Sequence, residues 1–197
     1  MSDIYYIIPK PGEAKVTEKM SRFLAFAIHV ESEQEAREKV KEYENKYHDS
    51  RHVCWAYMIG PERNTWQLSD NGEPSGTAGK PILGQINSLG LTDVVVIVVR
   101  YFGGIKLGTS GLIAAYRQAA REALEDAGIE ERRRMLPLAV TFPYMSINDV
   151  MKVVKGEGLN VVEQKFDNTC EMRLEVAADD FPRIEGRLSG IDGVSVV

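Results

Sequence analysis

Two glycine-rich stretches on either side of an apolar run decide the fold of this chain. Residues 69–81 read SDNGEPSGTAGKP, and residues 94–116 read VVVIVVRYFGGIKLGTSGLIAAY. The continuous apolar run at residues 94–99 is typical of a central strand that is covered on both faces. Each glycine-rich stretch leads into a run of apolar residues at helical spacing, and Pro81 suits a first helical turn, where no N–H is needed. The sequence therefore predicts two loop–helix units separated by a buried strand.

The ends of these loops are expected to attract anions. The first N–H groups of a helix have no partner within the helix, so they favour negative charge. Between residues 76 and 121 the charged side chains are Lys80, Arg100, Lys106, Arg117 and Arg121, against Asp93 alone. The whole chain, by contrast, has a net charge of −5. We expect the two loops to meet in space and to present a local anion-binding hollow.

The overall composition sets broad limits on the class of protein. The chain has 197 residues, 44% hydrophobic and 27% charged, which is ordinary for a soluble globular protein of one large or two small domains. It contains no apolar run of the roughly 20 residues that span a bilayer, and its first residues do not resemble a signal peptide. The two cysteines, Cys54 and Cys170, are expected to be buried reduced thiols, which fits a cytoplasmic location. A pI near 5.4 argues against a chain that coats nucleic acid indiscriminately.

The N-terminal part alternates strand and helix signals. Residues 13–30 predict two strands, and a capping box at Ser32 predicts a helix over the following residues. Residues 53–59 and 66–68 predict a hairpin whose turn lies at residues 60–64. The helices that follow the two loops are expected at residues 81–89 and 109–126.

The pattern after Gly128 predicts a second, smaller domain. The charged run EERRR at residues 130–134 marks the boundary, so we expect domains at residues 1–131 and 135–197. Apolar periodicity in the second domain gives the order β-α-β-β-α-β, the ferredoxin-like arrangement, and the chain as a whole is assigned to the α+β class. Acidic residues outnumber basic ones in this domain. It is therefore expected to position the first domain or to contact protein rather than RNA.

Three stretches carry a resemblance to the YigZ/IMPACT family. They are DNGEPSGTAGKP at residues 70–81, VVRYFGGIKLGTSGL at residues 98–112 and HDSRHVCWA at residues 48–56. The resemblance implies an N-terminal domain of the ribosomal protein S5 domain 2-like type and a C-terminal ferredoxin-like domain, paired as in the fourth and fifth domains of elongation factor G. Eukaryotic relatives are linked to control of translation initiation through an extra N-terminal domain. We do not expect this chain to contain that extra domain or to share its ribosome-associated partner, because its family core begins within the first 20 residues.

The leading hypothesis is contact with RNA or the ribosome through the N-terminal domain. Lysine, arginine and loop amides would hold phosphates, while Tyr101 and Phe102 would stack on bases or pack on the core. The candidate ligand- or RNA-binding residues are Arg51, His52, Asp70, Gly72, Glu73, Gly76, Thr77, Gly79, Lys80, Arg100, Tyr101, Gly103, Gly104, Lys106, Gly108, Thr109 and Gly111. A protein partner in the translation machinery is also expected, and a membrane partner is not.

Other functions stay open at this point. The stretch LGTSG at residues 107–111 would suit a small phosphorylated ligand or nucleotide, with or without turnover, although neither loop matches a Walker A motif. His52 and Cys54 share a strand face and would suit a nucleophile–base pair, but a strand-packed thiol is the commoner arrangement. Carboxylates in a DNGE turn usually cap backbone N–H groups. We expect no catalytic residue, metal or cofactor and a regulatory role, the third possibility being a protein-interaction module without nucleic-acid affinity.

Overall fold

The computed structural model describes residues 3–197, and these divide into two compact units. One unit comprises Ile4–Arg132, and the other comprises Arg133–Val197 together with Asp3. Both units combine helices with antiparallel strands, so the predicted mixture of α and β structure is confirmed.

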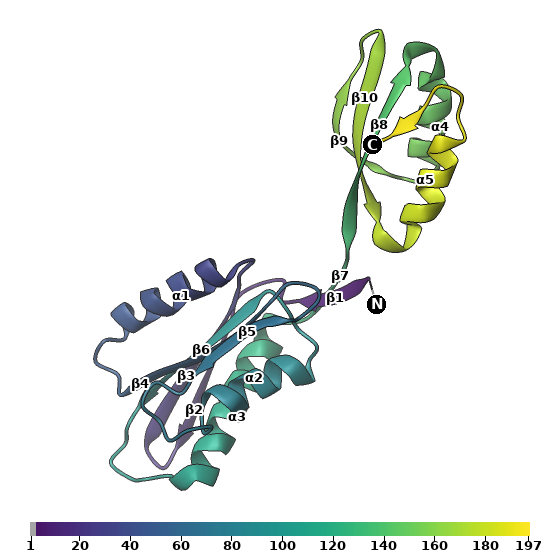
Figure 1. Cartoon of the computed structure of the whole chain (residues 1–197). Coiled ribbons are helices and arrows are strands. Elements are labelled where there is room, and N and C mark those ends of the chain that lie inside the picture. Colours follow the sequence, from purple (N-terminus) through teal and green to yellow (C-terminus); the bar gives the residue numbers. More distant parts are fainter. Residues whose placement is uncertain (1–2) are drawn as a thin grey trace. The chain divides into compact units, whose positions relative to one another are not determined.

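A five-stranded sheet forms the frame of the first unit (Figure 1). Its strand order is β2-β3-β6-β4-β5, with every neighbouring pair antiparallel. The bounds are β2 (Gly12–Glu18), β3 (Ser21–His29), β4 (His52–Ile59), β5 (Thr65–Ser69) and β6 (Val94–Tyr101). The apolar run occupies β6, the central strand, where residues 94–99 are all buried, as predicted, and the following Arg100 is buried as well.

Helices cover the two faces of this sheet. The helix α1 (Glu33–Lys46) lies on one face and begins at Ser32, whose side chain accepts from the Glu35 amide. The helices α2 (Gly79–Ser88) and α3 (Gly108–Ala127) lie on the other face, where they pack together (Figure 1). Apolar side chains of alternate strand residues fill both layers, because successive residues of a strand point to opposite faces.

The second unit has the predicted element order. It runs β8 (Met135–Pro143), α4 (Ile147–Gly156), β9 (Asn160–Lys165), β10 (Thr169–Ala177), α5 (Phe181–Ser189) and β11 (Ser195–Val196). Two short 3-10 turns, Tyr144–Ser146 and Ala178–Asp180, precede α4 and α5. The sheet order is β11-β8-β10-β9, and the inward residues of β8, β10 and both helices form one buried core.

The charged run was not predicted to be part of a sheet. Its residues form β7 (Glu130–Arg133), which pairs with β1 (Ile4–Ile7) in a separate two-stranded sheet. Sequence reasoning missed this pair because four-residue strands are too short to show a clear alternation of apolar and polar residues.

Candidate functional site

Three strands of the first unit bring polar side chains to one end of the sheet. His52 at the start of β4 lies opposite Arg100 near the end of β6, and Phe23 of β3 lies opposite the same arginine. Cys54 and Val98 belong to the core beneath α2 and α3. His52 and Arg100 are two residues away from them along their strands, so their side chains leave the sheet on that same face.

A buried ion pair joins the first loop to this sheet end. Glu73 accepts from Arg100 Nη1 at 2.6 Å, and the side chains of Glu73 and Arg100 are only 3% and 7% exposed. The Tyr116 hydroxyl of α3 donates to the same carboxylate oxygen at 2.7 Å. Because a buried charge needs both a counter-ion and hydrogen bonds, these contacts fix the loop on the sheet.

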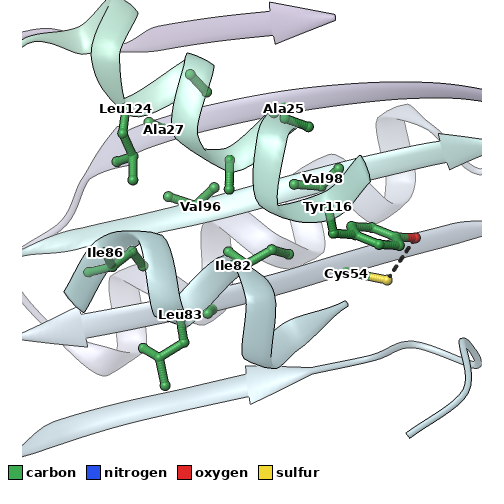
Figure 2. Close-up of a cluster of buried hydrophobic side chains, with 14 of the residues drawn as sticks. Ala25, Ala27, Cys54, Ile82, Leu83, Ile86, Val96, Val98, Tyr116 and Leu124 are labelled. Atoms are coloured by element: carbon green, nitrogen blue, oxygen red, sulfur yellow. Dashed lines mark hydrogen bonds between the residues drawn. The ribbon is translucent and has the colours of Figure 1, made fainter. Parts of the chain in front are cut away.

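Cys54 lies at the edge of the hydrophobic core, beside Tyr116 (Figure 2). Its sulfur is 3.3 Å from the Tyr116 hydroxyl and 3.1 Å from the Asp70 carbonyl oxygen. Burial raises the pKa of the Cys54 thiol to about 12, and burial likewise raises the pKa of Tyr116. The thiol is fully buried and protonated at neutral pH, so the nucleophile–base hypothesis for His52 and Cys54 is not supported.

His52 is oriented by the first loop. Its Nδ1 lies 2.7 Å from the carbonyl oxygen of Asn71, so this nitrogen carries the proton and donates. Its Nε2 is then directed to the Glu73 carboxylate, at 3.7 Å from Oε2. The imidazole therefore closes one side of the buried Glu73–Arg100 pair.

The first loop supplies its own anion to α2. One oxygen of the Asp70 carboxylate accepts from the Gly76 amide at 2.8 Å, and the other accepts from Ala78 and Gly79 at 3.1 and 2.8 Å. Burial alone would raise the pKa of Asp70, but these amides, with the Lys80 charge, lower it overall. The interpretation of this carboxylate as a cap is confirmed. The expectation that both helix N-termini are open to a ligand is wrong for α2.

The second loop leaves the N-terminus of α3 open. The residue before this helix, Leu107, makes no side-chain cap, and the first turn contains no acidic residue. The loop itself is held by Ser21, whose hydroxyl accepts from the Gly103 amide at 3.2 Å. Only glycine fits there, because a Cβ on Gly103 would lie 2.1 Å from the Met20 carbonyl carbon.

The two loops line one hollow, as expected from the sequence. We call it the loop pocket; its volume is about 450 Å³. The first loop contributes Glu73 and Pro74, the second loop Phe102, Lys106 and Leu107, α3 the residues Gly108, Thr109 and Leu112, and the strand ends Arg51, His52 and Arg100. The pocket thus has a floor made by the buried ion pair, apolar walls and an exposed cationic rim.

The structure separates other predicted residues from this pocket. Lys80 and Gly76 line a different hollow between α2 and α3, together with Arg117. Tyr101 lines a neighbouring hollow, where its hydroxyl donates to Asp49 and its ring lies under Arg22.

The remaining predicted residues have local roles. Thr77 is buried and donates to the Pro74 carbonyl at 2.6 Å. The glycines Gly72 and Gly104 lie at positive φ in exposed turns, and Gly111 lies inside α3.

Sequence reasoning missed several residues that build the site. No site role was predicted for Tyr116, Ser21, Phe23 or Arg22. Tyr116, Ser21 and Phe23 reach the site through packing of α3 on the sheet or pairing of β3 with β6, whereas Arg22 lines the neighbouring hollow with Tyr101. No local pattern marks them, so only the register of the strands reveals them.

Two further properties of the described residues bear on function. None of the helices within residues 3–197 is long and apolar enough to cross a bilayer. In the same range, no three His, Cys, Asp or Glu side chains gather in the way that a metal site requires.

Comparison with known proteins shows the class to which this fold and site belong. A family described as the Impact N-terminal domain matches residues 19–124, which include β3, both loops and most of α3. The chain is therefore a member of the IMPACT family, as the resemblance of its loops indicated.

Bacterial relatives match most of the chain. It is 40% identical to the IMPACT family member YvyE of Bacillus subtilis over 87% of this chain and 79% of that protein. It is 34% identical to YigZ of Escherichia coli over 93% and 92% of the two chains. The Saccharomyces cerevisiae protein IMPACT homolog is 30% identical over 58% of this chain and 45% of its own length.

A solved structure shares the fold of the whole chain. The crystal structure of a hypothetical protein superposes with a TM-score of 0.74 at 25% identity, and the match covers 100% of this chain and 98% of that one.

Proposed function

We propose that this chain is a cytoplasmic, translation-linked regulator whose first unit binds RNA, in or near the ribosome. The observation that carries the proposal is the cationic rim of the loop pocket beside the open N-terminus of α3. Phosphate oxygens bind both to cationic side chains and to the free N–H groups at a helix N-terminus. Such contacts hold an RNA strand without recognising its base sequence.

The rim has charge available for a ligand. Arg51 and Lys106 are exposed, and no ion pair joins either side chain to an acid within residues 3–197. Arg22 is also exposed and lies over the Tyr101 ring, with Asp49 the nearby acid. Phe102 is 47% exposed between the two hollows that these residues line. An exposed ring among cations is the combination on which single-stranded RNA stacks.

Each of the two units resembles a known fold, and we infer a role for the second unit as well. We assign the first unit to the ribosomal protein S5 domain 2-like fold and the second to the ferredoxin-like fold, which fits the β-α-β-β-α-β order. The link to translation comes from the resemblance to the IMPACT family, whose eukaryotic members are linked to that process. The acidic second unit is then suited to position the first unit or to contact a protein of the translation machinery.

The test is the salt dependence of RNA binding. Fluorescence anisotropy with a labelled single-stranded RNA would compare wild type with Arg51→Ala/Lys106→Ala across salt concentrations. Each lost phosphate contact lowers the magnitude of the slope of log K against log salt by about 0.7 on a single strand, so the double variant is expected to lose roughly 1.4. Ribosome co-sedimentation would repeat the comparison on the natural assembly.

The matched control is Lys39→Ala/Lys41→Ala, which removes the same charge from α1 on the opposite face of the sheet. This control should keep the wild-type slope. Lys80→Ala should change binding less than Lys106→Ala, because Lys80 lies outside the loop pocket. Equal slopes for all variants, or no RNA and no ribosome binding by wild type, would refute the proposal.

A further inference from the structure

We propose that the loop pocket is a subsite for a phosphate monoester, supplied by a terminal phosphate of RNA or by a free mononucleotide. Internal phosphodiesters would instead contact only the rim. The inference deepens the proposed function, since it concerns the same surface and names the chemical group that the pocket selects.

Arg100 at the pocket floor has hydrogen-bond donors that the protein leaves without a good partner. This residue is only 5% exposed, and its Nε is buried without a hydrogen-bond partner among the described residues. Its Nη1 is engaged by Glu73, whereas Nη2 has only a long contact of 3.4 Å with the Ser21 hydroxyl. Nε and Nη2 form the edge of a guanidinium that binds phosphate or carboxylate through two parallel hydrogen bonds. A buried donor without a partner calls for an explanation. Arg100 lines the loop pocket, so an anion that enters the pocket is the partner that this edge would gain, after a shift of the covered side chain.

The helix N-termini of this unit differ in how they are capped. The α1 terminus is capped by Ser32, and the α2 terminus is filled by the Asp70 carboxylate. The α3 terminus, which opens a helix of 20 residues, has no side-chain cap, and its residues Gly108 and Thr109 line the pocket. An anion in the pocket would occupy for α3 the position that Asp70 occupies for α2.

The charges around the pocket match those of a phosphate monoester. The Glu73 carboxylate is paired with Arg100 and also accepts from Tyr116, so the charges of these two floor residues offset each other. Arg51 and Lys106 add two positive charges at the rim. A phosphate monoester carries about −1.5 to −2 near neutral pH, which two cations balance, whereas a phosphodiester carries only one negative charge.

The shape of the pocket suits a small ligand or the end of a strand. The pocket is a hollow of about 450 Å³ with apolar walls that include Phe102, Leu107 and Leu112. Concave sites of this size bury small ligands around a few polar groups, whereas grooves that follow a running strand are open at both ends. A terminal nucleotide can place its phosphate at α3 and its base on the exposed Phe102 ring.

The experiment compares ligands that differ only in the terminal phosphate. Anisotropy would measure one short RNA with a 5′-phosphate, a 3′-phosphate or hydroxyl groups at both ends, and adenosine 5′-monophosphate and adenosine would serve as competitors. We expect at least tenfold tighter binding of a phosphorylated end at physiological salt, and competition by the nucleotide but not by the nucleoside.

The informative variant is Thr109→Asp, which places a carboxylate at the α3 N-terminus. Acidic residues in a first helical turn stabilise the helix, so the protein should fold while its own carboxylate excludes phosphate. This variant should lose the preference for phosphorylated ends, and Thr109→Asn should keep most of it. Thermal unfolding would verify that both variants are folded.

The outcomes separate this inference from the proposed function. If RNA binds through the rim with equal affinity for all three ends, the inference is overturned and the proposed function stands. If only the mononucleotide binds, and Thr109→Asp abolishes that binding, the phosphate subsite stands and RNA as its source is refuted. If neither RNA nor mononucleotide binds, both proposals fail.

Discussion

The Glu73–Arg100 pair offers the sharpest test of how the site is built. Replacing Glu73 with leucine removes the counter-ion of a guanidinium that is only 7% exposed, and Arg100→Met leaves a carboxylate that is 3% exposed. Breaking a buried pair from one side typically costs about 3–5 kcal/mol, because the remaining charge stays buried without compensation. With a urea m-value of roughly 2 kcal/mol/M, each single variant should lower the unfolding midpoint by about 1.5–2.5 M.

The double variant Glu73→Leu/Arg100→Met should be more stable than the sum of the two single effects predicts. Replacing both charges with apolar groups of similar volume is often nearly neutral, although the Tyr116 hydroxyl would lose its acceptor here. The coupling between the two substitutions should therefore be a substantial fraction of either single loss.

Tryptophan fluorescence during urea unfolding suits this cycle. Both tryptophans of the chain, Trp55 and Trp66, lie in the first unit, so their signal reports that unit alone. Additive losses in the double variant would refute the reasoning. Such a result would mean that Glu73 and Arg100 are not held together in solution as the structure shows.

Three further predictions concern other parts of the protein. Asp70→Asn should lower the unfolding free energy at pH 7 by about 1–2 kcal/mol, because the carboxylate caps α2. The folded-state pKa of Asp70 is depressed, so its stabilisation is present above the unfolded pKa of about 3.9 and is lost as the pH falls through the folded value. The difference in unfolding free energy between the variant and wild type should therefore vanish in acid. A thiol reagent should label Cys54 and Cys170 only as fast as the protein opens, because both are fully buried, and rapid labelling of the native chain would contradict this. Gly103→Ala should destabilise the first unit by about 1–3 kcal/mol in the same urea assay, since its Cβ would overlap the Met20 backbone; an unchanged midpoint would show that the loop can move away.

Much of the fold was predictable because the signals are local. The run at residues 94–99 indicated a central strand, and the second unit was predicted from alternation such as that at residues 170–176. Pairing of β1 with β7 was not predictable, since the sequence EERR has no apolar alternation. Strands of this kind are stabilised by their partner rather than by their own composition.

The site was predictable as two loops but not as a set of contacts. The motifs marked His52, Glu73 and Lys106, all of which line the loop pocket. Nothing in the local sequence distinguishes the buried Arg100 from the exposed Lys106, because their exposure depends on strand register and helix packing. The prediction grouped Lys80 with Arg100 and Lys106 by charge alone, although the structure places Lys80 in a different hollow, between α2 and α3.

The contrast between the two loops also explains why glycine content is a poor guide to ligand binding here. Both loops lead into a helix. The first loop begins with Asp70, directly after β5, and the Asp70 carboxylate accepts from three amides further along the loop and at the start of α2. Between Tyr101 and Gly108 the second loop contains no acid, so α3 has no equivalent partner within its own loop. An acidic residue just before a glycine-rich loop therefore indicates a helix that is already capped. By this reasoning, the proposed anion-binding face is narrower than the glycines and charges of the sequence indicate, and it is centred on the N-terminus of α3.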